Sequence, residues 1–324
     1  MSIDKMFGEN NFRFGVESFL FMSLDHFQIV QAKELESFEA RNPDSLDYNL
    51  YFIIQRPKVR VDPNSFKSNH KVASLNLIVE NGETHHECIL SFEIPKAQTK
   101  LKIQTKYPYE TFVIGDEIQP FLIANAGIII DEAEWNDIVT THLDYEILYI
   151  GQAFGKEGNR LAHQRLSNHS TLIKILSDIN KYSPHMEAHF MFVEFKYSNA
   201  LSSAAQDLIK VSKPNRIIQD KKIQDFFSDQ RILNDRKTLI NITEAALIKY
   251  FQPRYNSNFK DTFPSSAHKS YQNLYEKDIK SIYLEIELDH LRKIYTKKVC
   301  REVRHFSQFQ INKDRDRYDL FQFS

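Results

Sequence analysis

Two segments of this chain, about a hundred residues apart, carry side chains that are typical of phosphodiester chemistry. The first reads Tyr149-Ile150-Gly151 and is followed downstream by Arg165 and His169. The second begins at Glu244 and ends in Pro253-Arg254-Tyr255-Asn256. Together they supply a phenol, a guanidinium, an imidazole, a carboxylate and an amide. This set of groups suits the metal-assisted cleavage of a phosphodiester.

Each side chain has a physical reason to take part in such a reaction. Arg165 and His169 are four residues apart, so on a helix they project from the same face. A guanidinium binds phosphate through paired donors and stays charged at any working pH. Glu244 offers a hard oxygen ligand for Mg²⁺, which takes one or two carboxylates and keeps several waters. Arg165 and the metal would share the charge that builds on the phosphate.

Two groups are candidates to accept the proton of the attacking water. Tyr149 is one of them, because positive charge around a phenol favours its ionised form. His169 is the other, because an imidazole titrates nearer neutrality. The sequence leaves both alternatives open.

The same residues also have ordinary structural interpretations. Asn241-Ile242-Thr243-Glu244 is a capping-box pattern, in which Glu244 would only cap its helix. Arg165 and His169, taken singly, fit a solvated surface, and Tyr149 fits a core aromatic at the end of a strand. Their order and spacing taken together favour a shared site.

The composition limits the class of protein. The chain has 324 residues, 42% of them hydrophobic and 26% charged, which is typical of a globular protein with two domains or one domain with an insertion. The net charge of −1 means that attraction to nucleic acid must come from local patches. Cys88 and Cys300 give neither a disulfide framework nor zinc spacing. We expect a cytoplasmic protein without a signal peptide or a membrane span, since the longest apolar run, Phe121–Ile130, is too short.

The elements that must position these residues follow from the pattern of apolar side chains. The expected strands are Tyr48–Ile54, Ala73–Val79, Cys88–Ile94, Phe121–Ile130, Glu146–Gly151, Ala188–Tyr197, Ile279–Glu287 and Phe306–Ile311. Asn81-Gly82 predicts a tight hairpin turn between two of them. The expected helices are two short ones within 160–180 and one over 242–251, which stops before Pro253.

These elements predict an α+β fold in three parts. A β-rich domain of unknown role covers 1–117, and an α/β unit with a small central sheet flanked by helices covers 118–262. A β-rich C-terminal segment over 263–324 would complete the N-terminal domain. The central unit carries all of the candidate site residues.

The central unit resembles a GIY-YIG nuclease domain, and its second segment is most similar to the nuclease half of bacterial excision-repair incision subunits. The resemblance implies that Tyr149 lies on a central strand and that Arg165 and His169 follow on the first helix. It also implies that Glu244 binds the metal from a later helix and that Asn256 ends the adjoining turn. Glu244 and Asn256 are 12 residues apart, which matches the repair enzymes. The resemblance covers about 140 residues and neither flank.

The chain departs from the family in its first motif, Gly-Ile-Tyr, which normally lies about ten residues before the second. The residues at that distance, Glu134–Ile138, do not match. The nearest candidate is Gly127-Ile128-Ile129, with isoleucine where tyrosine belongs, and Tyr145 is a second candidate for the missing phenol. This loss bears on proton transfer and leaves the expected metal and phosphate contacts in place.

Basic residues gather in two stretches that suit a polyanionic partner. Residues 201–260 carry eleven Lys and Arg against six Asp and Glu, and Arg292–Arg304 carries six against one. Lys249 and Arg254 join Arg165 as candidates for contact with nucleic acid. A solvated protein face remains the alternative for either stretch. His85-His86-Glu87 is a poor metal site, because adjacent side chains on a strand point to opposite faces.

The resemblance implies an endonuclease that uses Mg²⁺ or Mn²⁺ to hydrolyse phosphodiester bonds, with DNA favoured over RNA as the substrate. A role in restriction or antiviral defence would fit such an enzyme by association. Two alternatives remain: a catalytically inactive nucleic-acid-binding module and a protein-interaction subunit.

Overall fold

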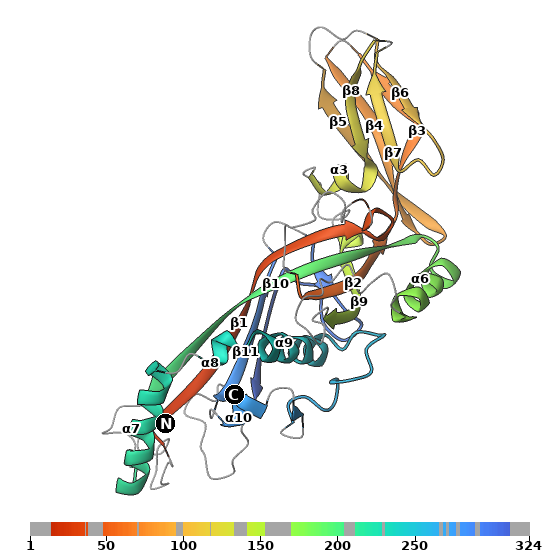
Figure 1. The fold of residues 1–324 in the computed structure, drawn as a ribbon. Helices are drawn as coiled ribbons and strands as arrows, with labels where there is room; N and C mark the ends of the chain where they lie inside the picture. The colour runs from red at the N-terminus through yellow and green to blue at the C-terminus, as the bar shows by residue number, and fades with distance from the viewer. Residues whose placement is uncertain are drawn as a thin grey trace, which may run out of the picture.

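A seven-stranded, curled β-sheet forms the centre of the protein in a computed structural model of the chain (Figure 1). The structure describes residues 14–35, 37, 48–69, 71–94, 100–116, 118–132, 141–152, 170–203, 211–228, 231–265, 268–269, 272–276, 279–288 and 292–311. The strand order is β12-β9-β2-β10-β1-β11-β13. These strands are β1 (Val16–Gln31), β2 (Leu50–Pro57), β9 (Tyr145–Gln152), β10 (Met186–Ser203), β11 (Ile279–Glu287), β12 (Ile294–Tyr295) and β13 (Arg304–Gln310). The fold is therefore of the mixed α+β class.

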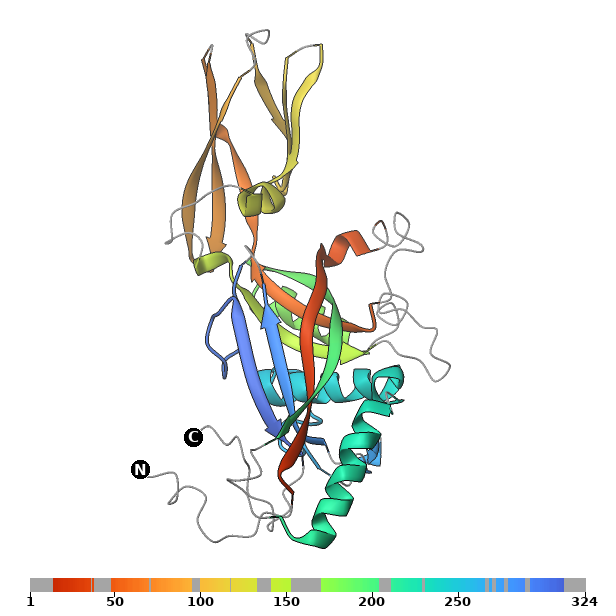
Figure 2. The ribbon, with the colours of Figure 1, turned by 90° about the vertical axis from the view of Figure 1, so that its left-hand side faces the viewer.

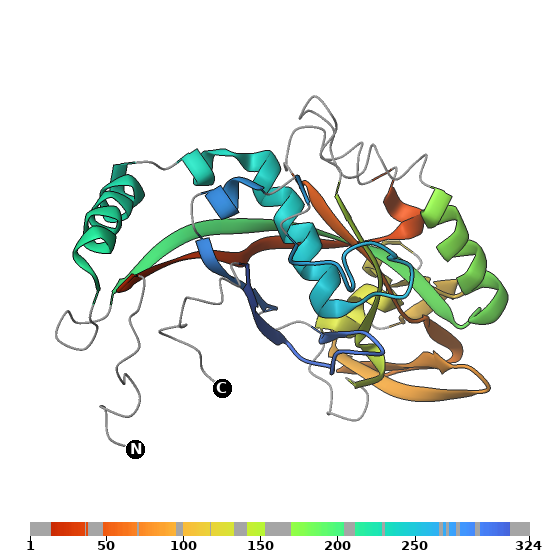
Figure 3. The same cartoon turned by 90° about the horizontal axis from the view of Figure 1, so that it is seen from below.

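Strands β1 and β10 are the long central strands of this sheet. They pair antiparallel from Val16 opposite Ser203 to Gln31 opposite His189. Figure 3 shows this pair running most of the length of the molecule, with α7 (Lys213–Ser228) at its far end. β2 lies antiparallel between β10 and β9, whereas β11 is parallel to β1.

Helix α9 (Arg236–Phe251) packs on one face of the sheet. Ten of its sixteen residues are buried, which is typical of a core helix that is apolar on most sides. The Asp235 side chain caps its start by accepting from the Thr238 amide at 3.1 Å. Gln252, at φ 48°, ends it in a left-handed conformation. The expected helix over 242–251 thus begins a turn and a half earlier, and Glu244 lies in its interior. The capping-box interpretation of Glu244 is wrong.

Helix α6 (Ser170–Tyr182) covers the opposite face. Its apolar stripe, Leu172, Ile175 and Ile179, packs into a cluster with Tyr51 and Ile53 of β2 and Phe190 and Phe192 of β10. The shorter helices include η1 (Ala32–Glu34), η2 (Thr141–Leu143), α8 (Arg231–Asn234) and α10 (Gln272–Glu276). None of the helices in the described part of the chain is long and apolar enough to cross a membrane.

A smaller β-sandwich extends from the main sheet (Figure 2). One of its layers is β3 (Val59–Ser68), β4 (Val72–Asn81) and β5 (Thr84–Glu93). The other is β6 (Lys102–Thr105), β7 (Thr111–Gly115) and β8 (Pro120–Asn125), followed by α3 (Ala126–Glu132). The expected hairpin at Asn81-Gly82 is confirmed: β4 and β5 pair antiparallel around it, with Gly82 at φ 67°.

The sandwich lies in the chain between β2 and β9, which are neighbours in the main sheet. The predicted division at 117/118 falls between β7 and β8, which pair with one another. The main sheet also takes strands from all three predicted segments. The pairing therefore divides the chain into a sheet unit and an inserted sandwich, because strand partners here are chosen by packing and not by sequence proximity.

The apolar run Phe121–Ile130, expected as one strand, is a strand only in its first half and a helix in its second. β8 ends at Asn125, and the Asn125 side chain accepts from the Gly127 amide at 2.8 Å at the start of α3. A continuous apolar run fits a buried strand or a buried helix equally well. Gly127-Ile128-Ile129 consequently lies in a helix at the base of the sandwich and not on a strand of the main sheet.

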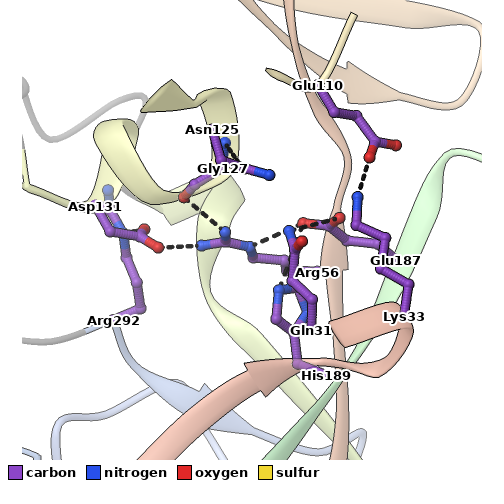
Figure 4. A network of polar contacts seen from close by, with 10 residues as sticks. All are labelled: Gln31, Lys33, Arg56, Glu110, Asn125, Gly127, Asp131, Glu187, His189 and Arg292. Carbon is purple, nitrogen blue, oxygen red and sulfur yellow. Dashed lines mark hydrogen bonds and ion pairs between the residues drawn. The ribbon is translucent and has the colours of Figure 1, made fainter. Parts of the chain in front are cut away.

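A buried arginine joins the sandwich to the main sheet (Figure 4). Arg56, on β2, is 2% exposed and donates to the Asp131 carboxylate at 2.6 Å and to the Gly127 carbonyl at 2.8 Å, both on α3. Its third contact is Glu187 of β10, at 3.3 Å. One side chain therefore binds two strands of the sheet unit and the helix of the sandwich together.

Further polar contacts surround this arginine (Figure 4). Arg292 donates to Asp131 at 3.2 Å, and His189 lies 3.5 Å from Glu187. Burial raises the pKa of Glu187, and the charge of Arg56 offsets only part of that rise. Burial and the guanidinium of Arg56 lower the pKa of His189 well below its ordinary value. We call Arg56, Asp131, Glu187, His189 and Arg292 the junction network.

Candidate active site

Two tyrosines meet over a glycine on the α6 face of the sheet. Tyr51 of β2 lies opposite Gly151 of β9, and Tyr149 precedes that glycine by two residues on the same strand. The Tyr51 and Tyr149 ring centroids are 6.2 Å apart. A Cβ atom on residue 151 would lie 2.7 Å from both Tyr149 Cε1 and the Tyr51 hydroxyl oxygen. Only glycine fits beneath this pair of rings.

Tyr51 is the site residue that the sequence did not reveal. It lies on the expected strand Tyr48–Ile54, but the whole sandwich separates it from Tyr149 in the chain. The one available signal was a tyrosine in a strongly apolar strand, which carries no spacing information. Its partner in space becomes visible only when β2 and β9 are seen to pair.

Tyr145, the expected substitute phenol, is positioned elsewhere. It packs in the core on the α9 side, with the Arg56 guanidinium 5.1 Å from its ring and His189 at 5.4 Å. Burial raises the pKa of Tyr145 strongly. Tyr51 and not Tyr145 is therefore the phenol beside Tyr149.

Asn256 clamps the outer edge of β9. Its amide oxygen accepts from the Ile150 N–H at 2.9 Å, and its amide nitrogen donates to the Ile150 carbonyl at 2.7 Å. The Tyr255 N–H adds a bond to the Leu148 carbonyl at 3.0 Å. The Pro253–Asn256 turn thus takes the place of a neighbouring strand next to Tyr149.

Tyr255 ties the same turn to α6. Its hydroxyl donates to the Asp178 carboxylate at 2.8 Å. Burial, followed by this bond to a carboxylate, raises the pKa of Tyr255 to about 12. The turn therefore bridges from the end of α9, around the edge of β9, to the helix on the tyrosine face.

We expect Asn256→Ala to lower the free energy of unfolding by about 1–3 kcal/mol, because it leaves both backbone groups of Ile150 without their partner. Chemical denaturation of the two proteins measures this difference. Asn69→Ala provides the comparison, because the exposed Asn69 side chain accepts only from the amides of its own turn. Equal losses for Asn69→Ala and Asn256→Ala would contradict the clamp.

Helix α9 brings Glu244 to the end of β9. The Asn241 side-chain oxygen accepts from the side-chain amide nitrogen of Gln152 at 3.0 Å, which joins the helix to the last residue of that strand. Glu244 follows three residues later, so it lies on the same side of α9. Asn241 and Glu244 are half-buried, whereas Ala245 and Ala246 beside them are fully buried. The carboxylate therefore lies on the side of α9 that meets the end of β9, on the sheet face opposite to the one that carries the tyrosine pair.

The groups around Glu244 offer Mg²⁺ a single carboxylate ligand. Among the described residues, no three His, Cys, Asp or Glu side chains gather as metal ligands. Mg²⁺ needs only one or two carboxylates when waters complete its octahedron, and half-buried Glu244 meets that need. The side-chain oxygens of Gln152 and Asn241 add neutral groups nearby.

The remaining expected site residues have different placements. Arg165 and His169 lie outside the described residues, in the stretch between Gln152 and Ser170. The Lys249 ammonium donates to the Lys260 carbonyl at 2.8 Å, which holds it against its own chain. The exposed Arg254 guanidinium lies over the Tyr255 ring at 5.2 Å.

Comparisons of the chain with protein-family models, with curated proteins and with solved structures give no match.

Proposed function

We propose that this protein is a Mg²⁺- or Mn²⁺-dependent endonuclease that hydrolyses phosphodiester bonds in DNA. The observation that carries the proposal is the meeting of Tyr51 and Tyr149 over Gly151. The clamp by Asn256 and the half-buried Glu244 at the same strand support it. In this proposal, β9, β2 and β10 correspond to the small central sheet of a GIY-YIG nuclease, enlarged here by four further strands.

The proposal also includes an explanation for the departure in the first motif. In the proposed site, the first tyrosine comes from the strand that pairs with the strand of Tyr149. In this chain Tyr51 on β2 takes that role, and the sandwich has been inserted between the two motifs. In this proposal the first-motif tyrosine lies far from the second motif in the sequence but next to it in the fold.

Each residue has a chemical role in the proposed reaction. The phenolate form of half-buried Tyr149 would accept the proton of the attacking water, with fully buried Tyr51 positioning that ring and His169 as the alternative acceptor. Arg165 binds the phosphate oxygens. Glu244 would hold the cation, which when bound neutralises charge on the phosphate and the leaving oxygen. Asn256 touches no substrate: it is a positioning residue that fixes β9.

The test is incubation of the purified protein with single-stranded and duplex DNA in Mg²⁺. We expect wild-type protein to cut DNA and EDTA to stop cutting. Glu244→Gln should lower the rate by about a hundredfold or more, because the metal loses its carboxylate. Glu93→Gln, an exposed carboxylate on the sandwich, is the matched control and should cut normally.

Equal rates for wild type and Glu244→Gln would reject this site. Salt-sensitive DNA binding without cutting by folded wild-type protein would instead favour the inactive binding module. RNA in place of DNA in the same assay identifies the nucleic acid that is cut.

A further inference from the structure

Two segments line the outer edge of β9 one after the other. β12 pairs in parallel with Tyr145 and Glu146 at the start of the strand. The 253–256 turn binds Leu148 and Ile150 farther along. Arg254 lies in the turn, and Lys297, Lys298 and Arg301 follow β12 in the chain, so positive charge lies along the edge of the strand that holds Tyr149.

The turn after β12 is built to present two lysines. The Thr296 hydroxyl donates to the Phe251 carbonyl at 2.6 Å and accepts from the amides of Lys298 and Val299, each at 3.1 Å. Phe251 is the last residue of α9. The lysine turn is thus fixed to the helix that carries Glu244, with Lys297 and Lys298 exposed.

Two arginines lie beside this turn with their guanidinium groups on tyrosine rings. Arg301 is 4.2 Å from the centroid of Tyr295, and its side chain is half exposed. Arg254 lies over Tyr255. Stacking of this kind orders a guanidinium and leaves its N–H donors at the rim of the plane. We call Arg254, Lys297, Lys298 and Arg301 the basic rim.

Arg292 belongs to the same basic stretch of sequence but not to this surface. Its side chain is 11% exposed and is engaged by Asp131 in the junction network. The described stretch 293–301 carries Lys293, Lys297, Lys298 and Arg301 and has no acidic residue. Outside this stretch, the Asp144 carboxylate lies 3.9 Å from the Arg301 guanidinium and offsets part of its charge. The four cations of the rim outnumber this one paired carboxylate, so the rim presents net positive charge.

We propose that the basic rim binds the sugar–phosphate backbone of duplex DNA without reading its sequence. This inference rests on the proposed function, because the rim borders the strand and helix of the candidate active site. Seven residues of α9 separate Glu244 from Phe251, which is about 10 Å along the helix axis. The rim accordingly contacts phosphates a few nucleotides from the bond that is cut and presses that strand against Glu244.

A purely structural role for the lysines makes a different prediction. Cations near the end of α9 would stabilise the helix dipole, and their removal would change the melting temperature and not the affinity for DNA. Phosphate contacts would instead give binding that weakens with salt, each contact adding about 0.9 to the slope of log K against log salt.

The experiment compares Lys297→Gln/Lys298→Gln/Arg301→Gln with a charge-matched control. The control is Lys67→Gln/Lys71→Gln/Lys100→Gln, all exposed on the sandwich. Binding to a labelled duplex of mixed sequence is measured in EDTA over a range of salt. We expect the rim variant to bind at least about tenfold more weakly at about 100 mM salt and to have a slope smaller by about two to three. In Mg²⁺ its KM should rise more than its kcat falls.

Lys297→Arg/Lys298→Arg keeps the charges and should bind like wild type, which guards against a folding defect in the glutamine variant. A rim variant that binds and cuts like the control overturns the rim and leaves the nuclease standing. Wild-type protein that binds but never cuts, with binding lost in the rim variant, supports the rim and rejects the nuclease. Wild-type protein that neither binds nor cuts rejects both.

Discussion

Arg56→Ala is expected to lower the free energy of unfolding by about 3–5 kcal/mol, the largest stability effect of any single substitution proposed for this protein. The substitution removes the cation that lies between Asp131 and Glu187. Glu187 is buried, and its other ion-pair contact in the described part of the chain is with His189, whose own burial lowers its pKa and opposes its protonation. Breaking one partner out of a buried ionic network is far more harmful than never having the network.

Urea denaturation followed by circular dichroism measures this loss. Arg60→Ala is the matched control, because Arg60 is the next arginine along the chain and pairs with Glu80 at a more exposed position. This pair is half-buried and partly screened by solvent, so its removal should lower the free energy of unfolding by less than the removal of Arg56. A loss for Arg56→Ala no larger than that of Arg60→Ala would show that the junction network does not hold the two units together.

Tyr51→Phe and Tyr149→Phe are each expected to slow DNA cleavage by about 10²–10⁴-fold, because Tyr149 transfers the proton and Tyr51 holds it in place. Each substitution removes one oxygen and keeps the ring that packs over Gly151. The melting temperature should therefore change little while the rate falls. The double variant should be hardly slower than the worse single variant, because residues that act as a unit are not additive.

Single-turnover rates at saturating DNA separate this chemical defect from weaker binding. Tyr255→Phe provides the control, since its hydroxyl binds Asp178 and lies outside the tyrosine pair. Normal cutting by both Tyr51→Phe and Tyr149→Phe, with cutting lost in His169→Gln, would assign the proton transfer to the imidazole instead.

Local pattern predicted much of the framework. The alternation in Ile279–Glu287 and the apolar texture of Glu146–Gly151 correspond to β11 and β9. The Asn81-Gly82 pattern predicted the hairpin, and its two-residue turn, Gly82-Glu83 with Asn81 paired to Thr84, sets the register. These features depend on residues that are close together in the chain.

Features that depend on distant partners were not predictable. The pairing of β2 with β9 brings Tyr51 to Gly151 across the full length of the sandwich, and no local spacing encodes it. The start of α9 was misplaced because Asn241 resembles a cap, whereas Asp235 caps the helix in the structure. Burial of Leu239 and Ile240 in the core stabilises the helix N-terminal to Asn241, which outweighs the local capping pattern at that residue.

The insertion of the sandwich also bears on how the chain reaches its native state. Residues 58–144 separate the two strands that a short connection would otherwise join. A loop roughly ninefold longer than a ten-residue one raises the entropy cost of closure by about 2 kcal/mol. Once the sandwich has folded and Arg56 has bonded to α3, the two ends of the sandwich are close together. Pairing β2 with β9 then no longer carries this entropy cost. The tyrosine pair is therefore expected to assemble late, after the inserted unit has become a folded linker.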